Sequence, residues 1–151
     1  MVRKAFFLLV LLVSFNSCDT DDEAAISDFE IAKAKWEKLQ FKDYTIQENT
    51  SCFCGGLLEW TTKVTSNEKD TVYYDDSKLY KGQTYQMVFD GAKTIDEAFD
   101  FIEQFDVKTV YYFDVVYDEQ FGFPKSISID YVENMADDEI TYLYSNFTPT
   151  K

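Results

Sequence analysis

Two segments of this chain carry the start signal of a helix, and each is followed by three segments with the periodicity of strands. Ser27-Asp28-Phe29-Glu30 and Thr94-Ile95-Asp96-Glu97 both place a hydroxyl three residues before a glutamate, which is the spacing of a capping box. The order helix, strands, helix, strands predicts an α+β domain. We expect a mainly antiparallel sheet of five to six strands, with two helices packed on one face.

Both predicted helices have one apolar face. In the first helix the apolar residues Phe29, Ala32, Trp36 and Leu39 recur at helical spacing. In the second helix the corresponding residues are Ile95, Ala98, Phe99, Ile102 and Phe105. We expect each of these faces to pack against the sheet.

Strand periodicity covers six segments. They are residues 44–50, 58–64, 71–74, 109–117, 125–132 and 140–147. In the last two, apolar and polar residues alternate, as in Ile127-Ser128-Ile129-Asp130, so each of these strands has one buried and one solvent-exposed face. We expect the last three segments to form a meander. Between residues 78 and 90 neither period prevails, and no element is assigned there.

The composition describes a folded, acidic chain. With 46% hydrophobic residues, 14 Phe and 11 Tyr, the sequence is too apolar for a disordered protein despite its formal net charge of −14. Fourteen basic against 28 acidic residues argue against a nucleic-acid partner. The absence of histidine excludes Ser-His-Asp and Cys-His hydrolases and histidine zinc sites. We therefore predict no enzymatic activity, no cofactor and no metal site.

The N-terminus has the pattern of an export signal. Arg3 and Lys4 precede nine apolar residues, 5–13, too few to cross about 30 Å of hydrocarbon but typical of a secretory signal. Phe15-Asn16-Ser17-Cys18 resembles a bacterial lipobox, which implies cleavage before Cys18 and lipidation of that cysteine. We predict a lipoprotein signal peptide over residues 1–17. The alternative is an ordinary cleaved signal that leaves Cys18 as a thiol.

An acidic segment follows Cys18. Four of the five residues 19–23 are acidic, and we expect residues 18–27 to form a solvated tether with no structure before Ser27. The segment resembles the lipoprotein export signal of Bacteroidetes, which implies an outer-membrane lipoprotein displayed on the cell surface. A plain spacer is the alternative. Residues 28–151 then form a single domain in the cell envelope, bound to the membrane through the lipid on Cys18.

Cys52 and Cys54 are the other two cysteines. If Cys18 carries lipid, they remain as an even pair in an oxidising compartment, where a disulfide between them is expected. Such a bond either rigidifies the bend between two strands or exchanges with thiols as a redox site. The structural role is favoured, because no histidine or neighbouring cation stabilises a thiolate in the sequence.

Exposed aromatic residues are the predicted binding surface. Tyrosine is more abundant than a core of this size requires, and a tyrosine-rich sheet face suits a protein or carbohydrate partner. The candidates are Tyr73, Tyr111, Tyr112, Tyr117, Phe121 and Phe123. The alternative is that these rings only cover a sheet that has one solvent-exposed face and bind no partner. Acidic runs such as Asp137-Asp138-Glu139 suggest a weaker third hypothesis, a calcium-dependent surface domain, although none has the spacing of an EF-hand.

Seven motifs occur in one order along the chain. They are Trp36, Asp43-Tyr44, Ser51-Cys52-Phe53-Cys54, the helix at 94–103, Val116-Tyr117-Asp118 with Phe121-Gly122-Phe123-Pro124, Ile127-Ser128-Ile129-Asp130 and Ala136-Asp137-Asp138-Glu139-Ile140. Together they resemble a bacterial family of exported, often lipid-anchored proteins called domain of unknown function 6174. The resemblance brings no activity with it. From the residues, we expect a lipid-anchored, non-enzymatic binding or accessory module of the cell envelope, with thiol-disulfide exchange as the alternative.

Overall fold

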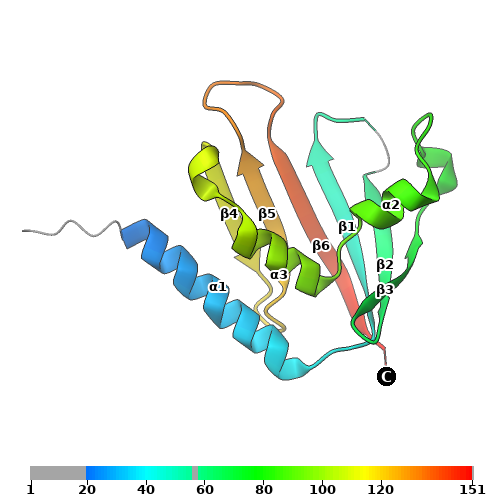
Figure 1. Ribbon diagram of the computed structural model, residues 1–151, viewed down its shortest axis with the longest axis horizontal. Coiled ribbons are helices and arrows are strands. Elements are labelled where there is room, and N and C mark those ends of the chain that lie inside the picture. Colours follow the sequence, from blue (N-terminus) through cyan, green and yellow to red (C-terminus); the bar gives the residue numbers. More distant parts are fainter. Residues whose placement is uncertain (1–19, 56–57, 151) are drawn as a thin grey trace, which may run out of the picture.

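The structure is a computed structural model that describes residues 20–55 and 58–150. Its helices are α1 (Thr20–Leu39), α2 (Tyr85–Gly91) and α3 (Ile95–Gln104), with short 3-10 turns at Asp76–Lys78 and Val107–Thr109. Its strands are β1 (Tyr44–Cys52), β2 (Glu59–Thr65), β3 (Glu68–Tyr73), β4 (Tyr112–Tyr117), β5 (Pro124–Asp130) and β6 (Ile140–Pro149). The predicted α+β class is confirmed (Figure 1).

All six strands form one antiparallel sheet in the order β3-β2-β1-β6-β5-β4. It consists of two meanders, β1-β2-β3 and β4-β5-β6, and the second of these was predicted. The pairing of β1 with β6 joins the two meanders at the centre of the sheet. The strands at the two edges are therefore β3 and β4 (Figure 1).

The main core lies between the sheet and the apolar faces of α1 and α3. Ile46 on β1 and Ile127 and Ile129 on β5 are buried in one cluster with Trp36 of α1 and Phe99 of α3. Both predicted helix faces contribute to this cluster, except that Leu39 is 40% exposed at the end of α1. A smaller cluster of Val72, Val88 and Ala92 fills the space between β3 and α2.

Two of the predicted surface rings lie in the core instead. Phe123 is 4% exposed, and its ring lies 5.4 Å from that of Phe147 on β6; Phe121 is half-buried, 5.8 Å from Phe41. Gly122 between them has a φ of +86° and lies against the carbonyl oxygen of Ala32. This turn directs both rings back beneath α1, so the prediction that Phe123 is exposed is wrong.

Several elements also differ from expectation, either in their bounds or because no element was assigned. Helix α1 begins at Thr20 rather than Ser27, and residues 23–25, Glu-Ala-Ala, are strong helix formers that extend it toward the N-terminus. Helix α2 lies within the segment to which no element was assigned. Strand β4 begins at Tyr112 rather than Thr109, because Asp106 caps a 3-10 turn over Val107–Thr109.

The predicted signal peptide, residues 1–17, and Cys18 lie outside the described residues. Within the part that the structure describes, the helices are too short or too polar to cross a membrane.

Candidate functional site

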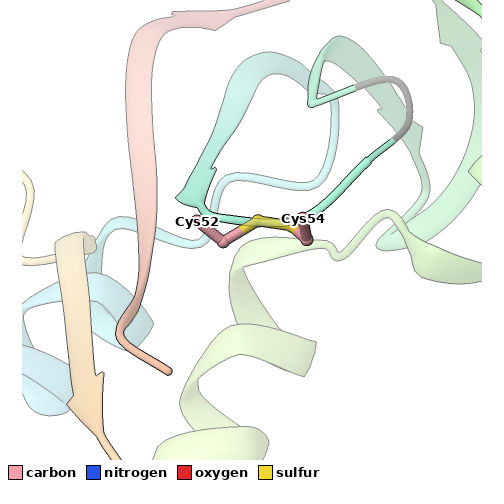
Figure 2. Close-up of a disulfide and its surroundings, with 2 residues drawn as sticks. All are labelled: Cys52 and Cys54. Carbon is pink, nitrogen blue, oxygen red and sulfur yellow. A yellow bond between two sulfur atoms is a disulfide. The ribbon is translucent and has the colours of Figure 1, made fainter. Parts of the chain in front are cut away.

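The structure pairs Cys52 with Cys54 in a disulfide at the end of β1 (Figure 2). Their Cα atoms are 5.2 Å apart, within the range a disulfide tolerates. Cys52 also pairs in register with Ile140 of β6, so one end of the bond is fixed on the central strands of the sheet. Phe53 between the two cysteines is 82% exposed. The disulfide therefore holds an exposed aromatic loop on the rigid part of the fold.

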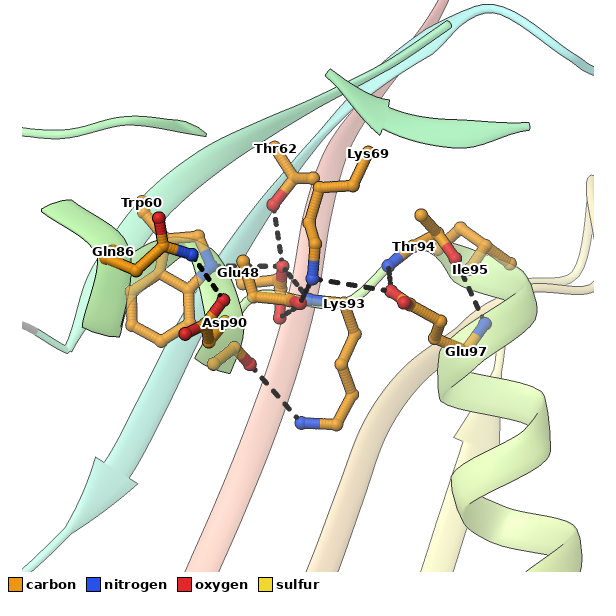
Figure 3. A network of polar contacts seen from close by, with 12 residues as sticks. Glu48, Trp60, Thr62, Lys69, Gln86, Asp90, Lys93, Thr94, Ile95 and Glu97 are labelled. Carbon is orange, nitrogen blue, oxygen red and sulfur yellow. Dashed lines mark hydrogen bonds and ion pairs between the residues drawn. The ribbon is translucent and has the colours of Figure 1, made fainter. Parts of the chain in front are cut away.

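Glu48 on β1 is the best-satisfied buried polar residue (Figure 3). Its Oε1 atom accepts hydrogen bonds from Trp60 Nε1 at 3.0 Å and from Thr62 Oγ1 at 2.8 Å. The amide N–H of Lys93 donates to Oε1 at 3.0 Å and to Oε2 at 3.2 Å. Burial raises the pKa of Glu48, and these hydrogen bonds partly oppose the rise.

The surroundings of Glu48 show that this network is structural. Tyr144 of β6 pairs with Glu48 in register, and its hydroxyl is buried with no hydrogen-bond partner in the structure. Glu48 is 4% exposed, so a substrate has no access to its carboxylate. The network instead fixes the connection between α2 and α3, which contains Lys93, on the buried face of β1 and β2.

The predicted tyrosine surface is not assembled in one place. Tyr73 and Tyr112 are 54% and 52% exposed, but they lie on β3 and β4, the opposite edges of the sheet. Tyr111 is 57% exposed and precedes β4. Tyr117 is half-buried and stacks on Phe99 of α3, with ring centroids 6.3 Å apart. With Phe121 and Phe123 in the core, the six candidate residues do not form a shared patch.

A groove with apolar side chains in its walls lies between α1 and the edge strand β4. Two adjoining cavities of about 290 and about 360 Å³ make it up, and both contact Asp28, Val115 and Tyr117. The first is also lined by Phe29, Ile102, Phe113 and Asp114. The second is also lined by Ile31, Ala32, Lys35, Val116, Asp118, Glu119 and Gly122. We call this feature the α1–β4 groove.

The helix wall of the groove comes from one stripe of α1. Asp28, Ile31, Ala32 and Lys35 follow each other at i, i+3, i+4 and i+7, so they lie on one side of the helix. Ala32 is buried, whereas Ile31 is 61% exposed. On the strand side Val115 and Tyr117 are half-buried, and Val116, which lies on the other face of β4, is 49% exposed at the rim. The groove therefore presents exposed Ile31 on its helix wall and half-buried Val115 on its strand wall.

The groove is also acidic. Asp28, Asp114, Asp118 and Glu119 line it, and Lys35 is the basic residue among its lining side chains. The Lys35 ammonium donates to the backbone carbonyl of Glu119 at 2.8 Å. Burial raises the pKa of the Tyr117 hydroxyl, and the nearby charges of Asp28 and Asp114 raise it further. The electrostatics thus favour positively charged groups in this groove.

A family model, described as a family of unknown function (DUF6174), matches residues 28–149 of the chain. The chain belongs to the DUF6174 family. This confirms the family resemblance that the order of the sequence motifs indicated. No curated protein and no solved structure matches the chain. The matched residues of this DUF6174 protein run from Asp28 to Pro149 and include both walls of the α1–β4 groove.

Apart from Tyr117, sequence reasoning missed the groove residues in this DUF6174 protein, because the two walls of the groove are distant in the chain. Lys35 and Glu119, which meet across the groove, are 84 residues apart. The available signal was the second stripe of α1, formed by Asp28, Ile31 and Lys35 beside the core stripe. Among the described side chains of residues 28–55 and 58–150, no three acidic or cysteine residues lie close enough together to hold a metal ion. The acidic runs that suggested calcium binding therefore do not form a carboxylate cluster among these residues.

Proposed function

We propose that this DUF6174 protein is a non-enzymatic binding module of the bacterial cell envelope, anchored to the outer membrane by lipid on Cys18. In this proposal the α1–β4 groove binds a polypeptide partner. The observation that carries it is the groove itself, which lies between exposed Ile31 of α1 and half-buried Val115 of β4, a strand with one neighbour among the described strands.

The shape of the groove favours a polypeptide over a compact ligand. Small-molecule sites are usually single enclosed cavities of about 300–1,000 Å³. Here two cavities of about 290 and about 360 Å³ follow one another along β4, which suits successive side chains of one chain. A carbohydrate, the other expected class of partner, favours exposed flat rings, whereas Ile31 and Val115, on the two walls of the groove, are aliphatic.

The disulfide supports the proposed location. Disulfides persist in oxidising compartments such as the bacterial periplasm and the cell surface, and the bond between Cys52 and Cys54 fits that environment. Growth with a labelled fatty acid tests the anchor directly. We expect the wild-type protein to incorporate the label and to fractionate with outer membranes, and Cys18→Ser to do neither. Label in the Cys18→Ser protein would contradict the proposed anchor.

Site-specific photo-cross-linking in the native cells tests the binding function. A photoreactive amino acid at Ile31, in the groove, is compared with one at Met87 of α2, because the two side chains are similarly exposed at 61% and 59%. We expect a discrete cross-linked polypeptide from position 31, identified by mass spectrometry, and none from position 87. Equal cross-linking at both positions would count against the groove as the binding site.

Thiol-disulfide exchange is the second candidate function, because Cys54 is exposed and paired only two residues from Cys52. Equilibration of the mature protein with glutathione buffers, followed by thiol counting, gives the reduction potential. A potential below about −300 mV marks a structural disulfide and excludes this candidate. A potential near about −200 mV, with rapid exchange in the native state, would favour it over the binding function.

A further inference from the structure

The two edge strands of the sheet differ in how they are protected. Exposed sheet edges attract other strands, and proteins usually protect them with charged residues. Strand β3 follows that rule, because Glu68, Lys69 and Asp70 are charged. Strand β4 does not: its sequence is Tyr-Phe-Asp-Val-Val-Tyr, with Asp114 as the one charge. The β4 edge is thus the edge of this sheet that is suited to accept a further strand.

The backbone of β4 is available on its outer side. Strand β4 pairs with β5 in register from Tyr112 to Val116, and it has no second neighbour among the strands that the structure describes. In an antiparallel pair, alternate residues direct their N–H and C=O groups away from the partner strand. Those groups lie along the outer edge of β4, whose residues also line the α1–β4 groove, so α1 lies beside the place of an added strand.

We propose that the partner inserts an extended segment of alternating basic and apolar residues beside β4, as a seventh strand of the sheet. This inference rests on the proposed binding function and specifies how the groove is used. Peptides bind exposed sheet edges in this way in other systems, with main-chain hydrogen bonds supplying affinity and alternate side chains supplying specificity.

The pleat of β4 explains the alternation. Phe113, Val115 and Tyr117 are half-buried and pack against the main core, whereas Tyr112, Asp114 and Val116 are exposed on the other face. Side chains of the added strand that lie on the same face as Phe113, Val115 and Tyr117 contact the apolar residues of the groove beside α1. Side chains on the second face lie opposite Asp114, where a basic residue makes a favourable cross-strand pair.

Charge makes a second copy of this chain a poor occupant. Each copy carries a formal net charge of −14, and pairing β4 with β4 brings two acidic grooves together. A basic segment removes that repulsion and neutralises Asp114, with Asp28 and Glu119 nearby along the groove. The observations therefore favour a basic partner over self-association.

Synthetic octapeptides test the inference on the mature chain carrying Cys18→Ser. The probe alternates lysine and valine; one control alternates glutamate and valine, and another has four lysines followed by four valines. We expect the probe to bind at least about tenfold more tightly than either control at physiological salt. We also expect amide hydrogen exchange to slow in β4 on binding and to stay unchanged in β3. Equal binding of all three peptides would overturn the inference.

Two protein variants test the contacts. Asp114→Lys should reverse the preference, so that the glutamate-valine peptide binds more tightly than the lysine-valine peptide. Ile31→Asp should weaken probe binding about tenfold, whereas its matched control Met87→Asp should leave it unchanged. An unchanged peptide preference in Asp114→Lys would contradict the proposed pairing of a basic residue with Asp114. Amide hydrogen exchange in β1 at the wild-type rate confirms that each variant is folded.

A backbone-modified probe separates this inference from the proposed function. N-methylation of every second residue along one edge preserves the side chains and charges but removes the donors needed for strand pairing. We expect it to abolish binding. If it binds as well as the probe, strand addition is wrong while groove binding survives. If no peptide binds but position 31 still cross-links a partner, strand addition by an alternating segment is again wrong and the proposed function stands.

Analytical ultracentrifugation tests self-association. A dimer of the wild-type protein that is lost in Asp114→Lys would assign the β4 edge to self-association instead of peptide binding.

Discussion

The amide N–H of Lys93 donates to both carboxylate oxygens of Glu48, at 3.0 and 3.2 Å. Glu48 lies at the centre of the sheet, and Lys93 lies in the connection between α2 and α3. Through this contact, a single buried carboxylate fixes the position of the segment that leads into α3. The contact also makes the fold sensitive to the chemistry of one side chain.

Replacing Glu48 with alanine should destabilise the protein by about 3 kcal/mol. The change leaves the donors of Trp60, Thr62 and Lys93 without their acceptor in a buried site, and each such group costs about 1–3 kcal/mol unless water enters. Urea unfolding followed by circular dichroism measures the loss. Glu59→Ala, on the exposed face of the neighbouring strand, should change stability by less than about 0.5 kcal/mol. Similar values for the two variants would contradict the structural role of Glu48.

Glu48 should also make stability fall as the pH rises. Because burial raises its pKa in the native state above the ordinary value of 4.5, the unfolded chain ionises first and binds fewer protons. The contribution of Glu48 to the unfolding free energy is therefore greatest below pH 4.5 and is lost as the pH rises through the native pKa. In Glu48→Gln this dependence should vanish, so that the variant gains stability relative to wild type from pH 4.5 upward. If the difference in unfolding free energy between wild type and Glu48→Gln stays constant between pH 4 and 8, the pKa of Glu48 is not raised in the native state.

Gly122 should not tolerate alanine. A Cβ at this position would lie 2.5 Å from the carbonyl oxygen of Ala32, and the φ of +86° is itself unfavourable for alanine. We expect Gly122→Ala to cost about 3 kcal/mol or more by urea unfolding, since strain and steric overlap add. Gly82→Ala is the matched control, because Gly82 has a φ of +91° but nothing within 4 Å of the added Cβ. It should cost only about 1 kcal/mol. Equal losses would show that the contact with α1 is unimportant.

Asp96 should link α1 to α3. Its Oδ1 atom accepts a hydrogen bond from Trp36 Nε1 at 2.7 Å. Asp96→Ala should lower the unfolding free energy by about 1–2 kcal/mol, whereas Asp96→Asn, which retains an acceptor, should lose about half as much. Asp100→Ala, one helical turn further along α3, provides the comparison and should have little effect. If Asp100→Ala lowers the unfolding free energy as much as Asp96→Ala does, the loss comes from removing a negative charge from α3 and not from the hydrogen bond to Trp36.

The helix α3 could be predicted from the sequence because local and tertiary preferences agree there. Its capping box forms as expected, with Glu97 N–H donating to Thr94 Oγ1 at 3.1 Å and Thr94 N–H donating to Glu97 Oε2 at 2.7 Å. Helix α2 was not assigned, because it spans seven residues and buries only Val88 completely. Its position depends on packing against Val72 of β3, which no local pattern reveals.

The placement of aromatic residues could be predicted only in part. Trp36 was correctly expected in the core. Phe123 was expected on the surface, because nothing local to residues 121–124 shows that the carbonyl of Ala32 lies beside Gly122. The α1–β4 groove as a whole could not be predicted for the same reason, although the stripe of Asp28, Ile31 and Lys35 marks its helix wall. Each of these features depends on contacts between segments far apart in the chain.

The two tryptophans occupy different clusters, and each indole N–H donates to a carboxylate. Trp36 lies in the main core and donates to Asp96, whereas Trp60 packs on the smaller cluster with Val72 and donates to Glu48. Single-tryptophan variants, Trp60→Phe and Trp36→Phe, therefore carry one fluorophore for each half of the molecule. Their emission spectra can show whether the α2 side of the sheet melts together with the α1 side or before it.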